Sequence, residues 1–151
     1  NVALYPEIFA EIKNRGHLVG SHTYNHFKGW FCSNDKYYEN VHKGAQMVSS
    51  NFFRPPYGRI KFSQARHLSD TYKIIMWDVL SQDYDEKISG EECFQNVVNY
   101  VNNGSIIVFH DSQKAHKNVQ YALPKTIEYL LKHNYTLRTV NTSIETSRAA
   151  I

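Results

Sequence analysis

Ser105-Ile-Ile-Val-Phe-His-Asp111 is the stretch that decides the fold class, because a near-continuous apolar run ends directly in a histidine and an aspartate. Strands of parallel sheets are buried on both faces and therefore appear as such runs. A second run, Lys73–Val79, is rich in β-branched and aromatic residues and predicts another buried strand. Shorter runs predict strands over His17–Gly20 and Tyr135–Val140.

Amphipathic helices are expected between these strands. The apolar spacing and the end signals predict five helices. The first runs from Pro6 to Gly16, and the second follows a cap at Ser33, Asn34 or Asp35 and has the apolar face Tyr38, Val41, Ala45 and Val48. The other three are expected over Phe62–Leu68, from Ser89 to Gly104, and over Tyr121–His133 with a start near Pro124. Alternating strands and helices imply parallel strands joined by crossover helices, which predicts an α/β fold. The small, polar tail from Asn141 onward is expected to fray.

Composition narrows the class of protein. The chain has 151 residues, of which 42% are hydrophobic, and this suits one globular domain over residues 1–151. A formal charge of +3, carried by scattered Lys and Arg, argues against nucleic acid as a partner. The longest apolar run is far too short for a membrane-spanning segment. Cys32 and Cys93 form no metal or redox motif, and two free thiols are favoured over a disulfide.

The first candidate site is His22-Thr-Tyr-Asn-His26, which follows the predicted strand His17–Gly20. Histidines four residues apart lie on one face of a helical turn, so both imidazoles can reach one divalent ion. The alternative is a pair of surface histidines in a polar loop. Two ligands are also fewer than the three protein ligands of a typical catalytic zinc site.

The second candidate site is the loop Arg54-Pro-Pro-Tyr-Gly58, which two prolines and a glycine make rigid. Such a loop can direct the Arg54 side chain and the Tyr57 backbone N–H into a site. Proline has no N–H, so Tyr57 is the first residue after the pair that can donate to an oxyanion. The alternative is a tight turn with an exposed arginine.

The third candidate site is His110, which comes directly after the apolar strand Ser105–Phe109, together with Asp83 after the strand before it. In barrels of parallel strands the chemistry gathers at the C-terminal strand ends. A histidine there can act as a general acid near neutral pH, and a carboxylate can hold its ring in one tautomer. The alternative is an ordinary strand-end histidine with a solvated aspartate.

In combination these segments resemble the polysaccharide deacetylase family, which includes chitin, chitooligosaccharide and peptidoglycan deacetylases. The resemblance runs from Tyr5 to about Leu137 and rests on four motifs in the family's order, namely Gly16-His-Leu-Val-Gly-Ser-His-Thr-Tyr-Asn-His26, Arg54-Pro-Pro-Tyr-Gly58, Trp77-Asp-Val-Leu-Ser-Gln-Asp83 and Ile106-Ile-Val-Phe-His-Asp111. Mild departures are Leu80 in place of an aspartate, Tyr84 in place of a tryptophan, and Val108 in place of a leucine.

The family's first motif, a strand that ends in Thr-Phe-Asp-Asp-Gly, would precede Asn1. Its aspartates are the family's general base and third metal ligand. The resemblance therefore implies a distorted (β/α) barrel that is incomplete at its N-terminus. It also implies that the chain as given has little deacetylase activity of its own.

The resemblance implies a metal-dependent hydrolase that removes N-acetyl groups from the amino sugars of a glycan. Zinc is the expected metal, with His22 and His26 as ligands. The remaining implied roles are Arg54 to orient the base, the Tyr57 N–H to hold the oxyanion, His110 to protonate the leaving nitrogen, Asp83 to tune His110, and Pro56, Val108 and Trp77 to line the substrate pocket.

Three alternatives stay open. The protein could be a hydrolase of the same superfamily that acts on a non-sugar amide, with a closed pocket instead of a groove lined by aromatic residues such as Trp30. It could be a non-catalytic carbohydrate-binding relative. The histidines could also be structural in a binding domain of the same fold. A location at the bacterial cell envelope is implied by the family alone.

Overall fold

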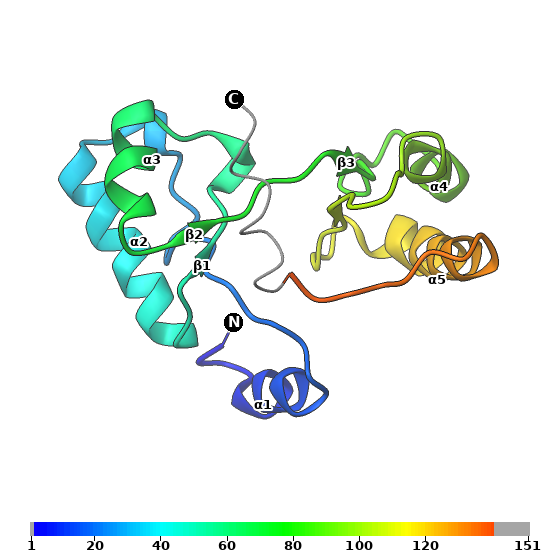
Figure 1. The fold of residues 1–151 in the computed structure, drawn as a ribbon, viewed down its shortest axis with the longest axis horizontal. Coiled ribbons are helices and arrows are strands. Elements are labelled where there is room, and N and C mark those ends of the chain that lie inside the picture. Colours follow the sequence, from blue (N-terminus) through cyan, green and yellow to red (C-terminus); the bar gives the residue numbers. More distant parts are fainter. Residues whose placement is uncertain (1, 141–151) are drawn as a thin grey trace. The chain divides into compact units, whose positions relative to one another are not determined.

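The computed structural model describes residues 2–140 and divides into two compact units. Of the described residues, one unit contains residues 2–76 together with Thr139 and Val140, and the other is Trp77–Arg138. The elements in chain order are α1 (Pro6–Asn14), η1 (Gly29–Phe31), α2 (Asn34–Val48), β1 (Phe52–Phe53), η2 (Pro56–Gly58), α3 (Phe62–Ser69), β2 (Lys73–Ile74), β3 (Val79–Leu80), α4 (Gly90–Val98), β4 (Ile107–Val108) and α5 (His116–Lys132) (Figure 1). The tail from Asn141, which was expected to fray, lies outside the described residues.

A two-stranded parallel sheet of β1 and β2 organises the first unit. The chain before it joins the sheet only at Ser21, which forms an isolated parallel bridge with Phe53. Two short backbone bonds make this bridge, from the Ser21 N–H to the Phe52 carbonyl at 2.7 Å and from the Arg54 N–H to the Ser21 carbonyl at 2.9 Å. The prediction of a strand over His17–Gly20 was therefore wrong, since pairing begins one residue later and does not extend.

The core of the first unit lies between α2 and this sheet. Its buried members are Tyr37, Val41, Ala45, Phe53, Leu68 and Tyr72. The buried face of α2 thus begins at Tyr37. The predicted face began at Tyr38, but that ring is only half-buried and stacks on His67 with ring centroids 4.1 Å apart.

A second parallel pair, β3 with β4, organises the unit Trp77–Arg138. Asp78 links the two segments just before these strands, since its carboxylate accepts hydrogen bonds from the Ser105 hydroxyl and the Ile106 N–H, both at 2.6 Å. The single strand predicted over Lys73–Val79 is in fact β2 and β3, which pair with different strands. A boundary between the units falls between them, at Met76.

Helices α4 and α5 pack along each other in this unit (Figure 1). Gly90 permits the contact, because a Cβ there would lie 2.6 Å from the Cβ of Tyr121. The predicted cap at Ser89 is present as a capping box with Glu92. Two predicted boundaries were wrong. α4 ends at Val98, short of Gly104, and α5 begins at His116 with Pro124 in its interior.

The α/β class and the parallel strands are confirmed, whereas a closed barrel is not. Over residues 2–140 the strands form two separate two-stranded sheets, and Tyr135–Val140 is not a strand. Cys32 and Cys93 are both free thiols, as predicted. Among the described helices, none has both the length and the apolar content needed to cross a bilayer. The interpretation of residues 1–151 as one catalytic domain stays a prediction.

Candidate active-site residues

His22 and His26 lie side by side in the loop that follows the Ser21 bridge. Their ring centroids are 4.9 Å apart and the ring planes are inclined by 66°. The Nδ1 of His22 lies 2.7 Å from the Arg54 carbonyl oxygen. A carbonyl can only accept, so Nδ1 carries the ring proton and the lone pair is on Nε2. Such a bond from one ring nitrogen is typical of histidines that ligate metals through the other.

This pair fits part of a metal site. Two exposed imidazoles in contact offer the nitrogen ligands that zinc prefers. Within residues 2–140, however, no cluster of three or more His, Cys, Asp or Glu side chains could hold a metal ion. The residues present thus supply two ligands, and metal binding by His22 and His26 stays a prediction.

Arg54 starts the rigid loop and is held by the carbonyl groups that follow β2. Its Nε donates to the Ile75 carbonyl at 3.0 Å and its Nη2 donates to the Met76 carbonyl at 3.4 Å. Burial lowers the pKa of the Arg54 guanidinium, although an arginine remains charged in proteins. The side chain therefore presents a cation that the surrounding backbone keeps in place.

Tyr57 adopts a left-handed backbone conformation with φ of 59°. The next two N–H groups, of Gly58 and Arg59, bond back to Pro55 and Pro56, whereas the Tyr57 N–H bonds to no acceptor among the described residues. Both prolines are buried, and Pro56 begins the single turn η2. This N–H is therefore available to a ligand, and its role as an oxyanion donor stays a prediction.

The Tyr57 ring touches the histidine loop. Its centroid lies 4.9 Å from that of His26, in an edge-to-face arrangement. The ammonium of Lys28 lies 4.6 Å from the centroid of the same ring. The first unit thus brings together His22, His26, Arg54, Pro56 and Tyr57, which sequence analysis had chosen from two separate motifs.

Asp83 and His110 form a tight pair in the second unit, beyond the ends of β3 and β4. The Asp83 side chain is fully buried, and its Oδ1 lies 2.6 Å from the His110 Nδ1. Its other oxygen accepts the backbone N–H of His110 at 2.5 Å. The imidazole is 40% exposed, so its Nε2 edge is the part of the ring that a substrate can reach. The predicted contact between these two side chains is present, and a catalytic role for them stays a prediction.

Several polar groups fix this pair from behind, and sequence analysis did not identify them. Asn118 on α5 donates to the Asp83 carbonyl at 3.1 Å, and the Ser81 hydroxyl donates to the Val108 carbonyl at 2.7 Å. Both side chains are almost completely buried. A buried polar residue among apolar helix positions, such as Asn118 near Ala115 and Ala122, was the available signal.

The remaining predicted substrate residues also lie in this unit. Val108 is buried and pairs in register with Leu80. Trp77 is half-buried and lies two residues before β3. Tyr84 is an aromatic neighbour of the His110 ring, at 5.0 Å between centroids. The assignment of Val108 and Trp77 to a substrate pocket stays a prediction.

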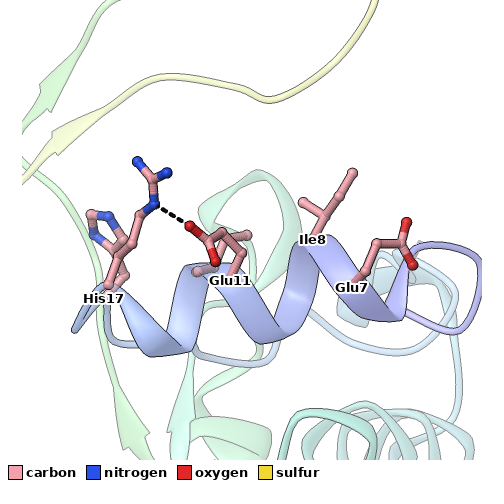
Figure 2. A pocket seen from close by; sticks show the side chains of 6 residues that line it. Glu7, Ile8, Glu11 and His17 are labelled. Atoms are coloured by element: carbon pink, nitrogen blue, oxygen red, sulfur yellow. Dashed lines mark hydrogen bonds and ion pairs between the residues drawn. The ribbon is translucent and has the colours of Figure 1, made fainter.

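The first unit also has a hollow beside α1. It is lined by Glu7, Ile8, Glu11, Ile12, Arg15 and His17 (Figure 2). Arg15 donates to Glu11 at 2.7 Å, one turn earlier, and both partners are exposed. None of the predicted site residues lines this hollow, and among the described residues its acidic and histidine side chains do not form a cluster that could hold a metal ion.

Comparison with known proteins shows which family this chain resembles. The sequence model of the family described as polysaccharide deacetylase matches residues 1–71. A peptidoglycan-N-acetylglucosamine deacetylase of Bacillus cereus is 28% identical over an alignment of length 156, which covers 98% of this chain and 56% of that protein. Chitin deacetylase 2 of Saccharomyces cerevisiae is 28% identical over 148 residues, which cover 89% of this chain and 44% of that protein. The chain thus spans about half the length of these relatives.

A solved structure agrees with these relatives. The crystal structure of a peptidoglycan N-acetylglucosamine deacetylase, in complex with a naphthalenyl N-hydroxybenzamide, superposes with a TM-score of 0.83 at 27% identity. The match covers 93% of this chain and 69% of that one. The similarity therefore extends through both units, well beyond the residues that the family model matches.

Proposed function

This chain belongs to the polysaccharide deacetylase family, and on that premise we propose that its protein is a metal-dependent hydrolase that removes N-acetyl groups from glycan amino sugars. Members of the family are typically metal-dependent, and the relatives act on N-acetylated glycans. The observation that carries the proposal is the contact of the buried Asp83 with the half-exposed His110. A buried carboxylate that fixes one nitrogen of an imidazole while the opposite edge faces solvent is an arrangement suited to general acid catalysis.

The proposed reaction cleaves the acetamide C–N bond and adds water, which gives acetate and a free amine. A divalent metal held by His22 and His26 would supply polarisation of the acetamide carbonyl and a lower pKa for the attacking water. The Tyr57 N–H donates to the oxygen that becomes negative in the tetrahedral intermediate. The family resemblance assigns Arg54 the task of orienting the carboxylate base.

His110 completes the reaction by giving a proton to the sugar nitrogen as the C–N bond breaks. Its Nδ1 is engaged by Asp83, so the proton leaves from Nε2. Asp83 stabilises the charged ring and holds its orientation, as a buried carboxylate does for a catalytic imidazole. The family resemblance assigns Val108, Pro56 and Trp77 to substrate binding.

The test uses the protein expressed from its complete reading frame. Acetate release from N-acetylglucosamine oligomers is measured with added zinc for the wild type and for His110→Ala. We expect His110→Ala to lower turnover about 10²–10⁴-fold, the usual contribution of general acid catalysis, and to leave bound zinc unchanged. The control is His116→Ala, an exposed histidine at the start of α5 in the same unit. Near-normal turnover of His110→Ala would remove this residue from the mechanism.

A further inference from the structure

The loop that carries His22 and His26 is attached to helix α2 by the side chain of Asn40. This side chain is only 8% exposed, and its Oδ1 accepts the backbone N–H groups of Tyr24 and Asn25, both at 3.0 Å. The Asn40 carbonyl also accepts the Tyr24 N–H at 3.0 Å. Asn40 thus holds the two peptide groups at the middle of the segment between the histidines.

Gly44 brings the same helix against the start of this loop, one turn after Asn40. A Cβ at this position would lie 2.8 Å from the Ser21 hydroxyl, 2.8 Å from the carbonyl carbon of Thr23 and 2.9 Å from the Tyr24 nitrogen. Non-bonded heavy atoms in proteins do not approach so closely without displacement. The loop therefore lies where it does only because position 44 has no side chain.

The loop needs such support because its backbone is strained at two positions. Thr23 and His26 have φ values of 65° and 56°, in the left-handed region that non-glycine residues avoid. Each such residue costs roughly 1–2 kcal/mol relative to ordinary backbone. Strained conformations persist only where the surrounding structure specifies them, and the hydrogen bonds of Asn40 between these two residues provide that specification.

We propose that Asn40 and Gly44 are positioning residues, which set the separation and orientation of the His22 and His26 imidazoles for one divalent cation. This inference rests on the proposed function, in which the two histidines share a metal. Ligands must be held close to their productive geometry by residues outside the metal's own coordination shell. The bonds from Asn40 fall between the ligands, so their loss changes the position of one ring relative to the other.

The test again uses the protein from its complete reading frame, with four variants. Asn40→Leu removes the acceptor at similar size, and Asn40→Asp keeps an acceptor at the same place. Gly44→Ala adds the methyl group that the loop cannot accommodate. Gln64→Leu is the matched control, because Gln64 is a fully buried amide of the same unit whose hydrogen bonds, to Lys61, Gly29 and Asn34, do not reach the segment from His22 to His26.

Zinc affinity, measured by competition with a chromophoric chelator, is the first readout. We expect Asn40→Leu and Gly44→Ala to bind zinc about 10–100-fold more weakly, as removal of supporting groups around a metal site usually does. Asn40→Asp and Gln64→Leu should stay within a fewfold of the wild type. Unchanged zinc affinity in folded Gly44→Ala, or in folded Asn40→Leu, would overturn the proposal, as would an equal loss in Gln64→Leu.

A second readout needs no metal, and it separates failure of this inference from failure of the proposed function. In the metal-free protein, amide hydrogen exchange at Tyr24 and Asn25 should be slow, and it should accelerate strongly in Asn40→Leu but not in Asn40→Asp. A wild type that binds no zinc would refute the proposed function. Fast exchange at both amides in the wild type would refute the role of Asn40 whatever the zinc result.

Discussion

Replacing Asp83 by asparagine tests how the buried carboxylate serves His110. The substitution removes a charge at almost constant volume. The new amide oxygen can still accept a hydrogen bond from the backbone N–H of His110, which Asp83 accepts at 2.5 Å. The amide NH₂ then faces Nδ1, where the carboxylate oxygen lay at 2.6 Å. Two donors cannot bond to each other, so the neutral ring must move its proton from Nδ1 to Nε2.

The size of the effect follows from the bond that is lost. A hydrogen bond to a charged group contributes about 1.5–3 kcal/mol, and each 1.36 kcal/mol of barrier changes a rate tenfold. Asp83→Asn should therefore lower kcat/KM about ten- to one-hundred-fold. This loss is smaller than that expected for His110→Ala, because the imidazole itself is still present to carry the proton.

Acetate release by the full-length protein measures kcat/KM, and long-range ¹⁵N–¹H correlation spectra of the imidazoles report the tautomer. Asp85→Asn is the control, since among the described residues the Asp85 carboxylate accepts a hydrogen bond only from the Lys87 N–H, two residues along the chain. An Asp83→Asn variant with unchanged kcat/KM and an unchanged His110 tautomer would refute the reasoning. A comparable loss in Asp85→Asn would show that the effect is not specific to the pair.

Three further predictions concern the unit Trp77–Arg138. The hydrogen bond from the Ser105 hydroxyl is the main cause that lowers the pKa of Asp78. The stability from this carboxylate should thus be present above its unfolded pKa and be lost as pH falls through the folded pKa, so thermal melts of Asp78→Asn should depend less on acid pH than those of the wild type. Burial raises the pKa of Cys93 to about 11, so iodoacetamide near neutral pH should modify it only after unfolding, as mass spectrometry can show. Gly90→Ala should destabilise the protein by about 1–3 kcal/mol in urea unfolding through its clash with Tyr121, although the same change in a free helix is favourable.

Local signals in the sequence predicted the helices better than the strands. Ser89 and Glu92 form the capping box that the sequence indicated, and α1 begins at Pro6 as expected. Such signals act within one turn of the chain and can therefore be read without knowing the rest of the fold. The start of α5 was misplaced because Pro124 was taken as a first-turn residue. The helix extends upstream of it because Ala115 and Asn118 are buried there, a tertiary effect.

Strands depend on partners that composition does not reveal. The run Lys73–Val79 is mostly apolar, yet its first two residues pair with β1 while Val79 belongs to β3 and pairs with β4. Tyr135–Val140 has strand-like composition and no ladder. The structure brings His22 into contact with His26 and Asp83 into contact with His110, whereas the roles of these side chains stay predictions. Their supports, Asn40 and Gly44, were missed because each is ordinary in a helix.

Backbone strain gives a physical reason why the spacing of apolar residues does not predict the local structure around these site residues. Ser49 and Asn134 have positive φ next to the ends of α2 and α5, where a left-handed residue commonly closes a helix. Thr23, His26, Tyr57 and Gln82 have positive φ without a helix end to explain it, and each is a candidate site residue or lies directly beside one. Patterns of apolar spacing assume relaxed backbone and cannot represent such positions. Residues that break a local rule at a cost need a compensating contact, as Asn40 provides for the histidine loop. The strained positions therefore mark the site independently of any motif.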